Sequence, residues 1–175
     1  MKTLKTWAAA AAMVAFAGAA QAALVNQGNG TVKDTNTNLI WLQDWDVNGQ
    51  QNWATQKAWA ETALNGFAGS NDWVLPSISQ YVDLFTAYGN LTLVAEFTDV
   101  QSYVYWSGTE FAPGFSAWYF VPVNGGQSGD DEVLRFFAVA VRPGDVTAPV
   151  PEPQTLALAL LALGATVVAR RRRPA

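Results

Sequence analysis

The 175-residue sequence contains no cysteine and no histidine. Composition therefore excludes Ser-His-Asp and Cys-His catalysis, His-ligated zinc sites and thiolate metal sites. A disulfide is excluded as well, so the stability of the fold must come from packing, for which 8 Trp, 5 Tyr and 9 Phe are available. The sequence also has no glycine-rich phosphate-binding motif, because Gly125-Gly126 fits a turn.

Basic residues are scarce in the central part of the chain. Of the 10 Lys and Arg residues, six lie in the first 22 residues or at 170–173. Residues 23–150 keep four basic side chains against 13 acidic ones, a net charge of −9. A segment this acidic is not expected to bind nucleic acid or anionic membranes by charge, and its length fits one domain.

The first 22 residues have the composition of a secretory signal peptide. A basic start is followed by an apolar stretch at 7–20 that is rich in alanine. Ala20-Gln-Ala22 then matches the small-residue pattern that precedes a cleavage site. We therefore expect signal peptidase to cut between Ala22 and Ala23, and the protein to be exported.

The C-terminus contains a second targeting pattern. A proline-rich linker at 146–155 leads to an apolar run at 156–169 without charged residues. Fourteen residues of helix span about 21 Å, less than the roughly 30 Å hydrocarbon core, so 156–169 alone would be a short and marginal membrane anchor. An ordinary tail anchor is the alternative. The run is followed by four basic residues that predict a cytoplasmic stop: Arg170, Arg171, Arg172 and Arg173.

The order of these C-terminal parts resembles the PEP-CTERM sorting signal of Gram-negative bacteria. The resemblance consists of Val150-Pro-Glu-Pro-Gln-Thr155, the apolar segment and the arginine cluster. It implies that an exosortase recognises the motif, cuts near Pro151, Glu152 and Pro153, and releases the protein or attaches it at the cell surface. The segment 156–169 would then lie in the inner membrane only transiently, as a sorting intermediate. Proteins with this signal are associated with exopolysaccharide and biofilm production.

Between the two processed ends, local patterns predict helices early and strands late. Residues 31–34 and 39–42 form a predicted hairpin, and 72–76 a short strand. Asn52 is a predicted N-cap of a helix that ends at Leu64. Ser77 and Gln80 form a predicted capping box for a second helix to Tyr88, whose apolar stripe is Ile78, Tyr81, Val82, Phe85 and Tyr88.

The aromatic and β-branched stretch 103–142 predicts the core sheet. Within it, 116–123 and 132–142 are predicted to pair as antiparallel strands around a turn at 124–126. Two helices followed by strands indicate an α+β fold.

The central segment 23–145 contains a series of short motifs in a fixed order: Gly28–Trp41, Asn52–Ala54, Asp72-Trp73, Leu75-Pro76, Tyr105–Glu110, Ala117–Tyr119 and Val139–Arg142. In these motifs the segment resembles the Lcl C-terminal domain family, a bacterial extracellular domain of largely unknown function. The resemblance implies a C-type-lectin-like fold, with two helices packed on an antiparallel strand meander. Val74 stands where the family usually has Arg, and Ala140 stands where Cys is common, so any salt bridge or disulfide that those residues form in the family is missing here.

One loop has the spacing that opens a calcium-binding loop. Asp44, Asp46 and Asn48 place oxygen atoms at alternate positions before Gly49. The twelfth position is Thr55 and not the bidentate glutamate of an EF-hand, so the pattern is half complete. Calcium binding is one hypothesis, and an acidic surface turn is the other.

Aromatic rings can stack on the faces of sugars, and Trp45 lies in a loop between two acids. We predict Trp45 as the exposed ligand-binding tryptophan, and Trp41, Trp73, Trp106 and Trp118 as structural. A shallow polar site is predicted from Ser107, Thr109 and Glu110. Their alternative role is to fix a turn by bonds from side chain to backbone.

These features favour a non-enzymatic protein of the cell surface or extracellular matrix. Its domain is expected to bind exopolysaccharide or to mediate adhesion, and a passive matrix component without a ligand is the alternative. A carboxylate-based glycoside hydrolase is less favoured, with candidate acids Asp44, Asp46, Asp130, Asp131 and Glu132.

Overall fold

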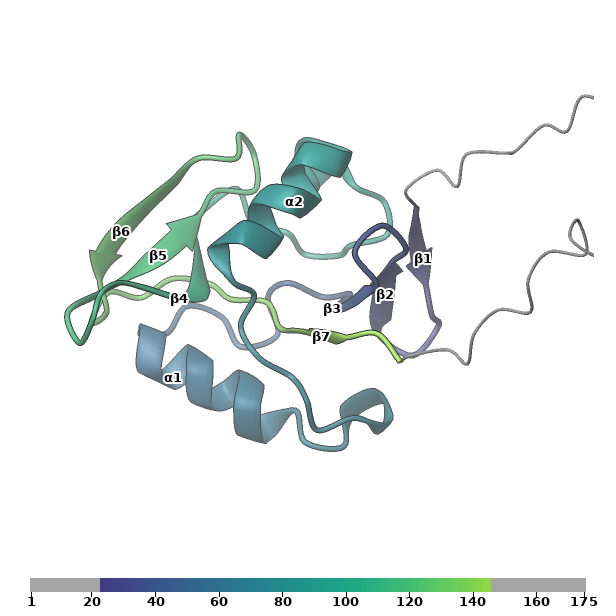
Figure 1. Ribbon diagram of the computed structural model, residues 1–175, viewed down its shortest axis with the longest axis horizontal. Helices are drawn as coiled ribbons and strands as arrows, with labels where there is room; N and C mark the ends of the chain where they lie inside the picture. The colour runs from purple at the N-terminus through teal and green to yellow at the C-terminus, as the bar shows by residue number, and fades with distance from the viewer. Residues whose placement is uncertain (1–22, 146–175) are drawn as a thin grey trace, which may run out of the picture. The chain divides into compact units, whose positions relative to one another are not determined.

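The computed structural model describes residues 23–145 and has an α+β fold with two antiparallel sheets (Figure 1). One sheet has the strand order β1-β2-β3-β7 and the other the order β4-β5-β6. The strands are β1 (Leu24–Asn26), β2 (Thr31–Asp34), β3 (Leu39–Leu42), β4 (Tyr105–Ala112), β5 (Ser116–Phe120), β6 (Gln127–Asp131) and β7 (Val141–Pro143). The helices are α1 (Trp53–Ala58), a π-helix at Trp59–Ala63, 3-10 helices at Phe67–Gly69 and Leu91–Leu93, and α2 (Ile78–Tyr88).

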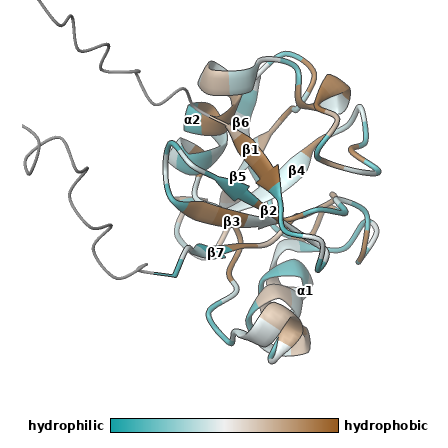
Figure 2. Cartoon of the chain, turned by 90° about the vertical axis from the view of Figure 1, so that its right-hand side faces the viewer, coloured by the Kyte–Doolittle hydropathy of each residue, from teal (hydrophilic) through white to brown (hydrophobic). Residues whose placement is uncertain are grey.

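The predicted hairpin is confirmed as β2 and β3, which pair from Thr31↔Leu42 to Asp34↔Leu39. Asp34 closes the turn, because its carboxylate accepts hydrogen bonds from Asn36 N at 2.9 Å and from Thr37 Oγ1 at 2.7 Å. The Tyr88 hydroxyl donates to the same carboxylate at 2.9 Å and ties α2 to this sheet. The mainly hydrophobic β3 lies between β2 and β7 (Figure 2).

Both predicted helix starts are confirmed. The Asn52 side chain accepts a hydrogen bond from Thr55 N, and α1 continues as a π-helix to Ala63. Ser77 and Gln80 form the capping box of α2. The apolar stripe predicted for α2 did not include Leu84, which is buried in the structure, as Tyr81 is.

The pairing predicted for the core sheet is wrong. Strand β5 pairs with the polar segment Gln127–Asp131, and not with the apolar run 132–142. The first part of that run is a turn at the surface, where Val133 and Leu134 are exposed. From Phe136 on, the chain passes through the middle of the domain, between α1 and α2, and ends in β7 beside β3 (Figure 1). Val139 and Ala140 are fully buried there, because a segment that is apolar on all sides loses most contact with water in the centre of the domain.

The strand predicted at 72–76 is reduced to a single bridge between Val74 and Val141. Helix α2 covers the β4–β5–β6 sheet, with the rings of Tyr81 and Phe120 stacked at 4.9 Å. Within residues 23–145, no helix has the length and hydrophobicity needed to cross a membrane. The predicted signal peptide and the predicted segment 156–173 lie outside the described residues, and the C-type-lectin-like topology stays a prediction.

Candidate functional site

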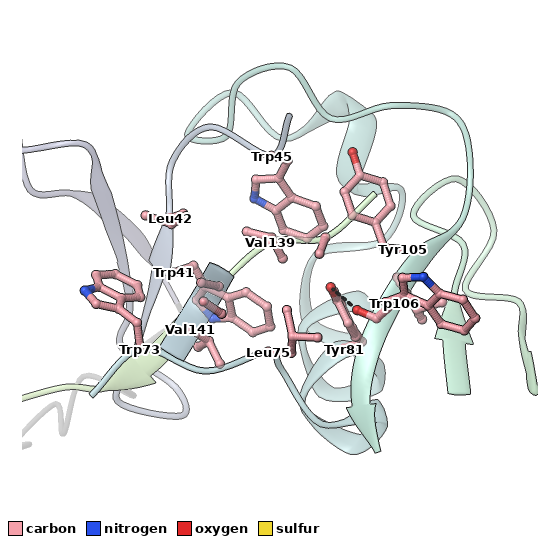
Figure 3. Packing of buried hydrophobic residues seen from close by; sticks show 14 of the residues in the cluster. Trp41, Leu42, Trp45, Trp73, Leu75, Tyr81, Tyr105, Trp106, Val139 and Val141 are labelled. Atoms are coloured by element: carbon pink, nitrogen blue, oxygen red, sulfur yellow. Dashed lines mark hydrogen bonds between the residues drawn. The ribbon is translucent and has the colours of Figure 1, made fainter. Parts of the chain in front are cut away.

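Trp45 is not a surface residue, and its prediction as the exposed ligand-binding tryptophan is wrong. Its side chain is 0% exposed, and Figure 3 shows it among the labelled core residues, close to Tyr105 and Tyr81. The ring centroids of Tyr105, Phe97 and Tyr81 lie 5.3, 5.0 and 6.1 Å from that of Trp45. The backbone explains this position. Trp45 N donates to Thr98 O at 3.0 Å, which holds the loop against the core with the indole turned inward.

Two of the three residues predicted to line a polar site make structural hydrogen bonds. Buried Ser107 donates its hydroxyl to Trp118 O at 2.9 Å. Thr109 Oγ1 accepts a hydrogen bond from Ile78 N at 3.1 Å, at the start of α2. Glu110 is exposed on β4. The contacts of Ser107 and Thr109 therefore favour the alternative interpretation, in which these side chains fix the local backbone.

The acidic loop brings carboxylates close to one another. Asp44 accepts a hydrogen bond from Asp46 N at 2.9 Å, and Asp46 accepts one from Gln101 Nε2 at 3.3 Å. Partial burial, together with the charges of Asp44 and Asp99, raises the pKa of Asp46. Within the range 23–145, no three His, Cys, Asp or Glu side chains are arranged to hold a metal ion. Calcium binding by this loop stays a prediction.

The third predicted calcium ligand belongs to a buried polar network that the sequence did not reveal. Asn48 Nδ2 donates to Gln56 Oε1 at 2.9 Å. Gln56 is 0% exposed and donates through Nε2 to Gly49 O at 2.8 Å and to Phe136 O at 2.9 Å. The acidic loop is thus joined to the core through one glutamine.

Two aromatic rings lie at the surface of the β4–β5–β6 sheet, and we call this pair, Phe111 and Trp118, the aromatic shelf. Their centroids are 4.9 Å apart, with the planes at 74°. Phe111 is 53% exposed and Trp118 is half-buried. The sequence assigned Trp118 to the core because it lies in an aromatic strand, and it gave no signal for Phe111.

A glycine on the third strand makes room for the aromatic shelf. Gly129 is directly opposite Trp118 in the β5–β6 register. A Cβ atom at position 129 would overlap the ring of Phe111. Phe111 therefore lies flat against the backbone of β6, and the aromatic shelf extends from β4 across β5 to β6.

Residues 30–143 match the model of the Lcl C-terminal domain, a range that includes β2 to β7 and the aromatic shelf. The chain belongs to the Lcl C-terminal domain family. Residues 149–173 of this Lcl C-terminal domain protein match the PEP-CTERM protein-sorting motif. The motif implies processing by an exosortase, export and sorting to the cell surface. No curated protein matches the chain.

Proposed function

We propose that this protein is a non-catalytic module that binds polysaccharide at the cell surface or in the extracellular matrix. The aromatic shelf is the observation that carries the proposal. Single exposed apolar side chains are normal on protein surfaces, but a contiguous pair marks a candidate contact surface. Phe111 and Trp118 form such a pair, and Gly129 leaves room for the Phe111 ring against β6, while Phe111 stays 53% exposed.

The shape and chemistry of the aromatic shelf suit a sugar ring. Aromatic faces offer large, rigid apolar area at a small cost in side-chain entropy, and the apolar face of a pyranose can stack on them. Phe115, which is 78% exposed in the turn between β4 and β5, adds further apolar surface at the same end of the sheet. A sorted surface protein would meet exopolysaccharide where it resides.

The carboxylates of β6 do not favour a glycosidase. Asp130 and Asp131 are successive residues of one strand, so their side chains point to opposite faces of the sheet. A glycosidase needs two carboxyl groups on either side of one bond, at a separation set by its mechanism. This geometry supports binding without cleavage.

The test is a thermal melt of the exported, processed protein with and without the exopolysaccharide of the producing cells. Ligand at about 100 times its Kd adds roughly 2.7 kcal/mol of stability, which raises the Tm by several degrees. Phe111→Ala and Trp118→Ala should abolish the shift. Tyr103→Ala is the matched control, since Tyr103 is 49% exposed and packs against Phe136, away from the aromatic shelf.

An unchanged Tm of the wild-type protein at high polysaccharide would refute the proposal. A passive matrix component without a ligand would then be the better description. A shift that survives both shelf substitutions would place the binding surface elsewhere on the domain.

A further inference from the structure

The aromatic shelf has a carboxylate beside it on the same face of the sheet. In the β5–β6 register, Trp118 faces Gly129, and two residues along each strand Ser116 faces Asp131. Side chains two residues apart on a strand share a face, so Asp131 follows the aromatic shelf at the spacing of diagonal neighbours, about 7–8 Å. A group attached to a stacked sugar ring lies within that range.

The carboxylate of Asp131 is oriented by the backbone. Val133 N donates to Asp131 Oδ1 at 3.1 Å, which holds an otherwise exposed side chain in place. An ionised carboxylate accepts up to about four hydrogen bonds, so it retains capacity for a donor group of a ligand.

Charge around the aromatic shelf favours a cation. Asp131 lies on the face of the aromatic shelf, whereas Asp130, its neighbour on β6, points to the opposite face. The domain as a whole is acidic, because residues 23–150 carry a net charge of −9. Arg135, the nearest basic residue along the chain, donates its guanidinium N–H groups to Gln50 O and Gln51 Oε1. A surface of this sign repels sulfated or uronic polysaccharides and attracts ammonium groups.

We propose that the aromatic shelf selects polysaccharides with free amino groups, namely de-N-acetylated hexosamine polymers. The sugar ring stacks on Phe111 and Trp118, and its ammonium group donates to Asp131. This proposal rests on the proposed polysaccharide binding, and it adds the class of sugar and the residue that distinguishes it.

The experiment compares three oligosaccharides by isothermal titration calorimetry with the exported, processed protein, in mildly acidic solution where hexosamine amines are protonated. The probes are a β-1,4-linked glucosamine hexamer, its fully N-acetylated form and an oligogalacturonate. We expect the free-amine hexamer to bind about fivefold more tightly than the acetylated one, the upper range for an exposed ion pair, with the difference shrinking at high salt. The oligogalacturonate should bind most weakly.

Variants assign the selection to Asp131. Asp131→Asn keeps an acceptor for Val133 N. It should make the affinities for the free-amine and the acetylated hexamer about equal, without changing the affinity for the acetylated hexamer. Asp83→Asn is the matched control, since it removes the same charge from an exposed position of α2. An equal effect of Asp83→Asn would show that net charge, and not this site, causes the preference, and would overturn the proposal.

The outcomes separate this proposal from the one on which it rests. Equal binding of the two hexamers refutes amine selection and leaves polysaccharide binding intact, whereas no binding of any probe or of the native exopolysaccharide refutes both. Analytical ultracentrifugation without glycan tests whether a second copy of the chain covers the aromatic shelf. A dimer that Trp118→Ala dissociates would mean that a second copy of the chain covers the aromatic shelf, and would refute the proposal.

Discussion

Removing the indole of Trp45 should destabilise the domain far more than removing that of Trp118. Trp45 is fully buried and touches four other aromatic rings, including Trp41 at 6.0 Å, so Trp45→Ala leaves a cavity that its neighbours cannot fill. Truncation of a buried large aromatic side chain costs about 3–5 kcal/mol. Trp118 is half-buried, and within residues 23–145 its one aromatic contact is the edge-to-face contact with Phe111. About half of that cost, roughly 1.5–2.5 kcal/mol, is expected for Trp118→Ala.

Urea unfolding followed by far-UV circular dichroism measures the difference without depending on tryptophan fluorescence. With a slope of about 2 kcal/mol per M, Trp45→Ala should lower the midpoint by about 2 M and Trp118→Ala by about 1 M. Val47→Ala is the matched control in the same loop, because Val47 is 53% exposed, and it should change stability by less than about 0.5 kcal/mol. A smaller loss for Trp45→Ala than for Trp118→Ala would refute the assignment of Trp45 to the core.

Three further predictions concern buried polar and titratable groups. Gln56→Leu removes three hydrogen bonds at about 1 kcal/mol each and should lower the free energy of unfolding in urea by roughly 2–4 kcal/mol. The same change at exposed Gln50 should lower it by less than about 0.5 kcal/mol. Equal losses for the two variants would contradict the role of the polar network around Gln56. Burial raises the pKa of Tyr81, of Tyr88 and of Tyr105, so these groups ionise first in the unfolded chain. Stability should therefore be intact below pH 10 and then fall by up to about 4 kcal/mol per pH unit, and constant stability from pH 10 to 11 would contradict this. Burial and two neighbouring aspartates raise the pKa of Asp46, so the folded protein loses stability as this carboxyl ionises. Asp46→Asn should therefore raise the Tm at neutral pH in the presence of a chelator, and this gain in Tm should disappear in acid. If the loop binds calcium, added calcium should raise the Tm of the wild-type protein and not of Asp46→Asn, and an unchanged wild-type Tm would end the calcium hypothesis.

Features that depend on a few neighbouring residues were predictable from the sequence. The N-cap at Asn52 and the capping box of Ser77 with Gln80 each involve atoms three residues apart, so their chemistry is complete within the local sequence. The family and the sorting motif were predictable for a similar reason, because short ordered motifs carry both resemblances.

Features that depend on contacts between distant segments were not predictable. Flanking acids suggested an exposed Trp45, but its backbone bond to Thr98 decides which way the side chain points. Strand propensity favoured residues 132–142 as the partner of β5, yet the polar β6 pairs with β5. The apolar residues at the end of that run lie in the core instead, because burial there removes more apolar surface from water. The aromatic shelf was hidden for the same reason, since Phe111 meets Gly129 across an intervening strand.

Strand β6 contradicts local propensity along its whole length, and this is informative about the surface that it supports. Gln127–Asp131 combines residues that are poor strand formers, and glycine in a strand interior weakens it further. Charged residues on an edge strand also discourage pairing with other chains. Substituting Gly129 by a β-branched residue would improve propensity but displace the ring of Phe111. Departures from local rules concentrate at functional sites, so the weak strand supports the aromatic shelf as a binding surface.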